Sequence, residues 1–129
     1  MRTILSVDDS SSVRMILRAG LRQQYNIVEA ASAEDAIEML DEGEEIDMIV
    51  SGYNMDNMNG YELLRHVRQS PIFSDLPFVI LSFEEDQNKI LEAQRANVDA
   101  WVKKPYILPN FLETLDECFK KRYMTSSSN

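Results

Sequence analysis

The sequence predicts an α/β domain with a doubly wound parallel sheet that is covered by helices on both faces. Three observations support this prediction: short apolar runs, an amphipathic segment after each run, and a length of 129 residues, which suits one hydrophobic core. Because five predicted strands alternate with five predicted helices, right-handed crossovers should place the strands parallel. Apolar residues make up 44% of the chain and charged residues 27%, which argues against a disordered or fibrous protein.

The first predicted unit is a strand at residues 2–7 followed by a helix. The strand ends at Asp8 and Asp9, and the serines after them are typical helix-capping residues. Helical spacing relates four apolar residues that we expect to pack: Val13, Ile16, Leu17 and Leu21. Arginines recur every four residues on another, solvated side of this helix.

The second and third strands are expected at residues 27–30 and 47–51. Between them, Ser32 and Asp35 stand three positions apart, as in a capping box, and predict the start of a helix. Gly43 is a plausible end for that helix. The continuous apolar run of the third strand is typical of a sheet that is covered on both faces.

The middle of the chain continues the alternation. Residues 52–59 form a predicted loop, and residues 60–69 a helix. A fourth strand is expected at residues 78–82 and a helix over residues 84–96. Asn97 can adopt the left-handed conformation that ends a helix.

The last predicted strand, residues 100–103, precedes an amphipathic helix that ends near Arg122. Its apolar stripe consists of Phe111, Leu112, Leu115 and Phe119. Basic residues close to Arg122 suit the negative end of the helix dipole. We therefore expect one domain over residues 1–122 and a polar C-terminal tail over residues 123–129.

The charge of the chain restricts its partners. Thirteen basic and 22 acidic residues give a formal net charge of −9, which repels phosphate backbones and anionic lipid headgroups. We therefore expect neither nucleic-acid nor membrane binding. Cys118 is the only cysteine and cannot form an internal disulfide, and no apolar run approaches the length that spans a membrane. These features predict a cytoplasmic protein.

Polar residues follow three of the predicted strands. Asp8 and Asp9 end the first strand, Ser82 ends the fourth, and Lys104 follows the fifth beside a proline. In doubly wound sheets, binding sites lie beyond the carboxyl ends of the strands. Oxygen ligands for a hard divalent cation, a hydroxyl and an ammonium group at one edge are what phosphoryl chemistry at a carboxylate requires.

These residues give the chain a family resemblance: it looks like a response regulator receiver domain, the CheY-like module of two-component signalling. Four segments carry the resemblance: VDDSSSVR, MIVSGYNMDNMNGYELLRHVR, VILS and VKKP. It covers almost all of residues 2–122. It implies the flavodoxin-like strand order 2-1-3-4-5 and a bacterial protein of signal transduction or of a phosphorelay.

The resemblance also assigns roles to single residues. In the family, an acidic pair helps to hold magnesium, and this pair matches Asp8 and Asp9, while the backbone carbonyl that completes the metal site matches Asn54. The hydroxyl and the lysine that contact the phosphoryl group match Ser82 and Lys104.

The chain departs from the family at the phosphoacceptor. Gly52 stands where the family places the aspartate that receives the phosphoryl group, and glycine carries no nucleophile. In the same loop, Asp56 replaces the usual proline and Asn59 a frequent aspartate, so the loop departs from the family's pattern at these positions as well. Several changes in one loop favour natural divergence over a single engineered substitution.

The loss of one carboxylate should weaken the metal site. Two like charges about 4 Å apart repel by roughly 4 kcal/mol at an effective dielectric constant of about 20, so a pocket without the third carboxylate is less strained when no metal is bound. The same loss removes a ligand for Mg²⁺, which sheds its waters reluctantly. We expect weak or absent magnesium binding, with Lys104 leaning toward Asp8 or Asp9 as their counter-charge.

The sequence favours a binding module over an enzyme. Without a phosphoryl group, a protein partner, for example a histidine kinase or an effector, must supply the energy that selects a conformation. The resemblance places the family's switch aromatic at Trp101, and we expect the partner on the face of the fourth helix, fifth strand and fifth helix, around Trp101 and Tyr106. Ile107, next to Tyr106, is expected to pack.

Two alternatives remain open. The chain could be a phosphorelay regulator of which this is an acceptor-null variant, or one that uses another acceptor such as Asp56. A magnesium-dependent phosphatase with an aspartate nucleophile on the first strand is a weaker reading, because those enzymes usually separate their paired aspartates by one residue, whereas Asp8 and Asp9 are adjacent.

Overall fold

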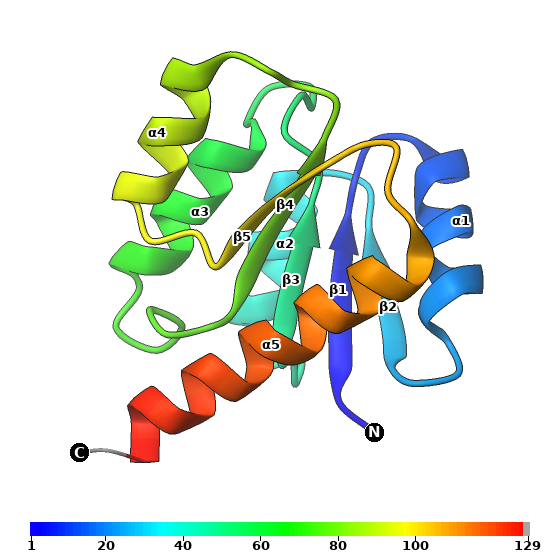
Figure 1. Cartoon of the computed structure of the whole chain (residues 1–129). Coiled ribbons are helices and arrows are strands. Elements are labelled where there is room, and N and C mark those ends of the chain that lie inside the picture. The colour runs from blue at the N-terminus through cyan, green and yellow to red at the C-terminus, as the bar shows by residue number, and fades with distance from the viewer. Residues whose placement is uncertain (128–129) are drawn as a thin grey trace.

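Five strands form one parallel sheet in the order β2-β1-β3-β4-β5, which confirms the expected fold class and strand order. The computed structural model describes residues 1–127 (Figure 1). The strands are β1 (Thr3–Val7), β2 (Asn26–Ala30), β3 (Met48–Ser51), β4 (Phe78–Ser82) and β5 (Ala100–Lys103). The helices are α1 (Ser11–Leu21), α2 (Ala33–Asp41), α3 (Gly60–Gln69), α4 (Gln87–Arg95) and α5 (Leu108–Ser127).

The helices form two layers, one on each face of the sheet. Helices α1 and α5 cover one face, and α2, α3 and α4 cover the other (Figure 1). Successive side chains of a strand point to opposite faces, so Ile4 packs with the α1–α5 layer and Leu5 with the α2–α4 layer, both fully buried. This double cover explains the continuous apolar runs of the central strands.

Side chains cap several helices where the sequence predicted a start. Ser10 accepts a hydrogen bond from the Val13 amide at 3.3 Å, and Ser32 accepts one from the Asp35 amide at 3.0 Å. Gly43 and Asn97 adopt positive φ angles of 90° and 64°, as expected for residues at helix ends.

The expected start of α4 at residue 84 is wrong. The carboxylate of Glu84 accepts hydrogen bonds from the amides of Glu85 and Asp86, at 3.1 and 3.3 Å, which holds these residues in a turn. Asp86 then caps the helix through the Asn88 amide at 2.9 Å, so α4 begins at Gln87.

The expected packing of Ile16 is also wrong. Leu17 and Leu21 of α1 are buried, but the Ile16 side chain is 63% exposed. Ile16 precedes Leu17 by one position, which is about 100° around the helix, so it lies outside the stripe that faces the sheet.

The C-terminal helix extends beyond the expected end of the domain. Helix α5 continues to Ser127, past Arg122, and residues 128–129 of the expected tail lie outside the described residues. The division at residue 122 therefore stays a prediction. Within the described part of the chain, no helix combines the length and apolar character needed to cross a membrane.

Candidate functional site

Four neighbouring strands place the predicted site residues at one edge of the sheet. Asp8 follows β1, Gly52 follows β3, Ser82 ends β4 and Lys104 follows β5, at the carboxyl ends of strands that are adjacent in the sheet (Figure 1). We call this group, together with Asp9, the rim.

The carboxylate of Asp8 fills the space beside Gly52. Its Oδ1 accepts a hydrogen bond from the Ser10 amide at 2.9 Å. A Cβ atom added to Gly52 would lie only 2.6 Å from Asp8 Oδ2. A side chain at position 52 therefore requires the Asp8 carboxylate to turn away, which is feasible because that carboxylate is the free end of a side chain.

This position is unfavourable for a charged Asp8 carboxylate. Burial raises the pKa of its carboxyl above the usual value, and the nearby charge of Asp9 acts in the same direction. The Ser10 hydrogen bond and the charge of Lys104 lower the pKa and offset part of this effect. The rim thus favours a protonated Asp8 more than water does.

The backbone of Asp56 returns to the rim and donates a hydrogen bond to Asp9. The distance from Asp56 N to Asp9 Oδ2 is 3.3 Å. Proline has no amide hydrogen, so the proline that the resemblance expects at position 56 could not form this bond. From the sequence, the absence of proline predicts that the amide of residue 56 can donate a hydrogen bond. It does not predict that Asp9 is the acceptor.

The loop before α3 is held by Asn59 and Gly60. Asn59 Oδ1 accepts from the Glu62 amide at 2.9 Å, and the Glu62 carboxylate accepts from the Asn59 amide at 3.0 Å, which completes a capping box. Gly60 approaches the preceding strand so closely that an added Cβ would lie 2.2 Å from the Gly52 carbonyl oxygen. Asn59 therefore serves as a helix cap, while Asn54 lies exposed in the same loop.

Ser82 and Lys104 both lie at the rim and contact neighbouring residues there. Ser82 is buried, and its Oγ accepts from the Glu84 amide at 3.0 Å. Lys104 forms no ion pair with Asp8 or Asp9 within 4.0 Å, although its charge acts on Asp8 as expected of a counter-charge and lowers the pKa of that carboxyl. Its Nζ instead lies 5.4 Å from the centre of the Phe83 ring, a contact that an ammonium group makes favourably with an aromatic face.

The two residues expected on the partner face are turned inward. Trp101 is partly buried against Tyr53, with ring centres 5.3 Å apart, and its Nε1 is buried without a hydrogen-bond partner among the described residues. Tyr106 packs on Phe111 at 4.7 Å between ring centres, whereas Ile107 is 65% exposed. The expected environments of Tyr106 and Ile107 are therefore reversed, because the ring of Tyr106 contributes to the core beside α5.

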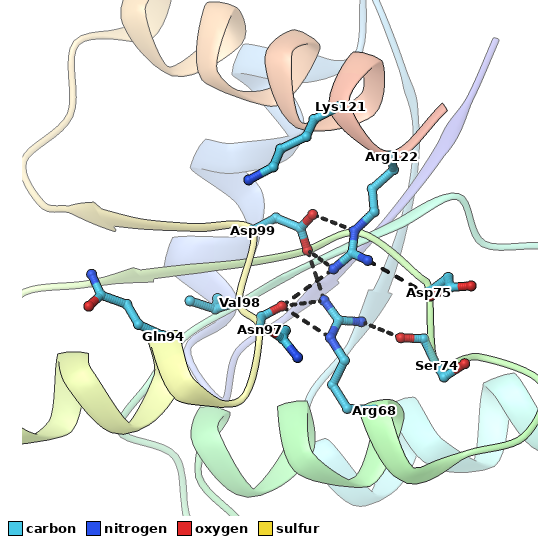
Figure 2. A pocket seen from close by; sticks show the side chains of 9 residues that line it. All are labelled: Arg68, Ser74, Asp75, Gln94, Asn97, Val98, Asp99, Lys121 and Arg122. Carbon is cyan, nitrogen blue, oxygen red and sulfur yellow. Dashed lines mark hydrogen bonds and ion pairs between the residues drawn. The ribbon is translucent and has the colours of Figure 1, made fainter. Parts of the chain in front are cut away.

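A second polar cluster lies away from the rim, where Asp99 precedes β5. A cavity of about 550 Å³ is bordered there by Arg68 and Arg122 (Figure 2). Both guanidinium groups bind Asp99, with shortest distances of 2.8 and 2.6 Å, and both also donate to the Asn97 carbonyl. We call Arg68, Asp99 and Arg122 the arginine clamp. Because its side chains bind one another and the Asn97 carbonyl, we assign it a role in stabilising the fold.

The fold and the rim define a doubly wound signalling-type domain with an acidic pair, a hydroxyl and a lysine at one sheet edge. The family model for the response regulator receiver domain matches residues 4–116. This chain belongs to that family, and so it is a CheY-like receiver domain of two-component signalling.

Relatives and solved structures agree with this assignment. The chain is 34% identical to chemotaxis protein CheY of Pseudomonas aeruginosa over 120 residues, which cover 92% of this chain and 96% of the relative. It is 33% identical to chemotaxis protein CheY-3 of Vibrio cholerae over 120 residues, 92% of each chain. The structure of Vibrio cholerae CheY4 superposes with a TM-score of 0.84 at 28% identity, over 92% of this chain and 98% of that one.

The rim fits the family's metal incompletely. Receiver domains generally bind Mg²⁺ at the phosphorylation site. Here Asp8 and Asp9 supply two carboxylates, but the first lies in the space beside Gly52 and the second accepts the Asp56 amide. Among the described residues, no group of three or more His, Cys, Asp or Glu side chains is arranged to hold a metal ion.

Proposed function

We propose that this receiver domain signals by binding protein partners without being phosphorylated. The observation that carries the proposal is Gly52 at the position that the resemblance assigns to the phosphoacceptor. An acyl phosphate forms on a carboxylate oxygen in line with the donor phosphorus, and glycine has none. The domain would then act as a binding module of the cytoplasm and have no autocatalytic phosphotransfer activity.

Weak or absent magnesium binding belongs to the same proposal. A cation would have to displace the Asp56 amide from Asp9 and would find no third carboxylate at Gly52. Mg²⁺ loses its hydration shell reluctantly, so a reduced set of charged ligands lowers its affinity. The Asp56 amide would then stabilise part of the negative charge of Asp9, which a bound cation stabilises in receivers that hold magnesium.

We retain the face of α4, β5 and α5 as the proposed site for a kinase or an effector protein. Trp101 and Tyr106 remain its marker residues, and substitution of either by alanine should weaken partner capture. Because both rings are packed, each variant needs a thermal unfolding curve beside the binding measurement. Unchanged capture by folded variants would count against this face.

The direct test of the proposed function is chemical labelling. We expect incubation with acetyl phosphate and Mg²⁺ to add no phosphoryl group to the intact chain, as measured by mass spectrometry. The chemotaxis protein CheY of Pseudomonas aeruginosa, treated identically, is the control for the donor. Stable addition of one phosphoryl group to this chain would contradict the proposal.

The variant Gly52→Asp tests whether the other rim residues still support phosphorylation when an acceptor is restored. Its added side chain displaces the Asp8 carboxylate, so we expect labelling to return only if Asp8 turns toward solvent. Gly52→Asn has nearly the same size and lacks a carboxylate, which makes it the matched control. Labelling of Gly52→Asp alone would restrict the loss to the acceptor, and failure of both variants would indicate wider divergence of the loop.

One observation favours the alternative acceptor enough to test it. The Asp56 amide lies 3.3 Å from Asp9, so the loop already folds back to the rim and Asp56 itself is exposed. If this chain were labelled, loss of the label in Asp56→Ala would assign the acceptor to Asp56. Retention of the label would direct attention to Asp8.

A further inference from the structure

A groove of about 580 Å³ lies at the amino ends of β3 and β4, the end of the sheet opposite the rim. One of its walls is the segment that leads from α2 to β3, and the other is the loop between α3 and β4. We call it the acidic groove, and its lining includes Asp41, Glu44, Glu45, Asp47, Ile72 and Phe73.

The charged side chains of the acidic groove are all negative. The wall that leads to β3 carries four carboxylates, and no basic residue is among the described residues that line the groove. Asp41, Glu44 and Glu45 are exposed, and they form no ion pair within 4.0 Å with a described residue. Their charges repel one another and produce a local negative potential that attracts a cationic partner.

The opposite wall presents apolar side chains on a hydrogen-bonded turn. Ser70 Oγ accepts hydrogen bonds from the amides of Ile72 and Phe73, both at 3.2 Å. The Phe73 carbonyl accepts the Leu76 amide at 3.0 Å. Ile72 is nevertheless 80% exposed. Because the turn already holds this side chain in water, contact with a partner requires little further ordering of the loop.

Hydrogen bonds also fix the acidic wall. Gly43, just after α2, has a φ angle of 90°, and its amide donates to the Leu40 carbonyl at 3.1 Å. Asp47 Oδ2 accepts the Thr3 amide at 2.7 Å, which connects the end of this wall to β1. The acidic groove is therefore a preformed surface with one charged wall and one apolar wall.

The two walls together match a cationic amphipathic helix. Among the described residues, no three carboxylates are grouped so that they could hold a metal ion, so the positive charges that match the acidic wall must be spaced along a chain. No strand residue lines the groove, so an extended segment would find no strand edge to join there. A helix satisfies its own backbone hydrogen bonds and can place a row of lysines beside a row of leucines.

We propose that the acidic groove binds a basic amphipathic helix of another protein. Its apolar side chains contact Ile72 and Phe73, and its lysines or arginines face the carboxylates of residues 41–47. A second copy of this chain is a poor occupant, because each copy carries a net charge of −9. This surface goes beyond the proposed function, because it lies at the other end of the sheet from the rim and does not depend on whether the chain accepts a phosphoryl group.

The test uses two synthetic helical peptides of about 18 residues. Both carry leucines at positions i, i+4 and i+7, and they differ in the row beside the leucines, which is lysine in one peptide and glutamate in the other. Titration of the lysine peptide into the full-length ¹⁵N-labelled chain should shift the amide signals of Glu44, Glu45 and Ile72. We expect the lysine peptide to bind roughly tenfold more tightly than the glutamate peptide, and added salt to weaken it.

Charge reversal separates this site from general attraction to an acidic protein. Glu44→Lys combined with Glu45→Lys should weaken the lysine peptide roughly tenfold. Glu92→Lys combined with Glu113→Lys is the matched control, because these residues are exposed on α4 and α5 and the net charge changes by the same amount. The control should bind the lysine peptide as the unchanged chain does.

The apolar wall has its own pair of variants. Ile72→Ser should weaken the lysine peptide severalfold, whereas Ile107→Ser, at a residue that is 65% exposed before α5, should leave its affinity unchanged. All these substitutions alter exposed side chains, so the variants should fold, and circular dichroism checks this.

Equal affinity for the two peptides, no binding of either, or equal weakening by the two charge-reversed pairs would overturn the proposal. Self-association of the unchanged chain that shifts the same signals without peptide would overturn the choice of occupant and thus the proposal. None of these results depends on acetyl phosphate labelling, so a failure at the acidic groove is distinguishable from a failure of the phosphorylation-independent function.

Discussion

The carboxylate of Asp8, which lies in the space beside Gly52, makes the stability of the domain depend on pH. Burial raises its pKa, so the folded state holds the proton more tightly than the unfolded chain does. The stabilisation that comes with protonation is complete below the unfolded value, 3.8, and is lost as the pH rises through the raised folded value. At neutral pH the ionised carboxylate therefore costs stability.

We expect Asp8→Asn to raise the midpoint of thermal unfolding by a few degrees at pH 7, because asparagine keeps the oxygen that accepts the Ser10 amide and loses the charge. The gain should shrink as the pH falls toward 4. Differential scanning calorimetry across this range measures it, with Glu45→Gln in an exposed loop as the control. A gain that is independent of pH would contradict the role given to the charge.

Asp56 permits a test of a single hydrogen-bond donor. Asp56→Pro removes the amide hydrogen that Asp9 accepts, and Asp56→Ala removes only the carboxylate. We expect Asp56→Pro, and not Asp56→Ala, to increase Mg²⁺ affinity severalfold, because Asp9 is then free to coordinate. Isothermal titration calorimetry measures both variants, and equal affinities would show that the bond does not compete with the cation.

At the scale of residues, the sequence predicts where a side chain lies along the chain but not the direction in which it points. Asp8, Asp9, Ser82 and Lys104 were predicted to share one edge because parallel strands end together, and they do. The contact of Lys104 with Phe83 was not predicted. It depends on which of several nearby partners a long side chain selects, and spacing along the chain does not encode that selection.

At the scale of elements, α3 depends on a glycine at its first position. A Cβ on Gly60 would lie 2.2 Å from the Gly52 carbonyl and 3.1 Å from Tyr53 Cα, and both are backbone atoms that cannot turn aside. We expect Gly60→Ala to lower the free energy of unfolding by about 2–4 kcal/mol, as overpacking does, and to disturb the loop before α3. Urea titration measures the loss.

Gly20→Ala is the matched control for this prediction. The added methyl group there meets Leu108 Cδ1 at 3.1 Å, which is the movable end of a side chain, and alanine favours the helix by up to about 1 kcal/mol. We expect its stability to stay within about 1 kcal/mol of the unchanged chain. If both variants lost the same free energy of unfolding, the close backbone contact of Gly60 would not be the cause of the loss.

Strands were easier to predict than the edges of helices. The strands at residues 78–82 and 100–103 were predicted with the bounds that the structure shows, because apolar runs between polar turns mark them clearly. The start of α4 was misplaced by three residues because Glu84 uses its side chain within the preceding turn. Such local hydrogen bonds compete with a helix without changing the apolar pattern.

At the scale of the whole molecule, topology followed from alternation but surface character did not. The parallel sheet and its two helical layers were predicted from right-handed crossovers, and the strand order was predicted from the family resemblance. Whether Tyr106 or Ile107 faces solvent depends on how the loop after β5 meets α5, which is a tertiary property. The apolar groove between α1 and the loops that follow β4 and β5 likewise arises only when these three segments come together.

The arginine clamp joins the two helical layers at a distance from the rim. Arg68 comes from α3 and Arg122 from α5, on opposite faces of the sheet, and both bind Asp99, whose side chain is only 3% exposed (Figure 2). Asp99 Oδ1 also accepts the Phe78 amide at 3.0 Å, which ties the start of β4 to the clamp. One carboxylate therefore connects α3, α5 and the sheet.

We expect Asp99→Ala to lower the free energy of unfolding by about 3–5 kcal/mol, because it leaves two largely buried guanidinium groups and an amide without their shared acceptor. Asp75→Ala is the matched control: that carboxylate is 90% exposed and lies 3.9 Å from Arg122, so its loss should cost less than about 0.5 kcal/mol. Guanidinium titration compares the two.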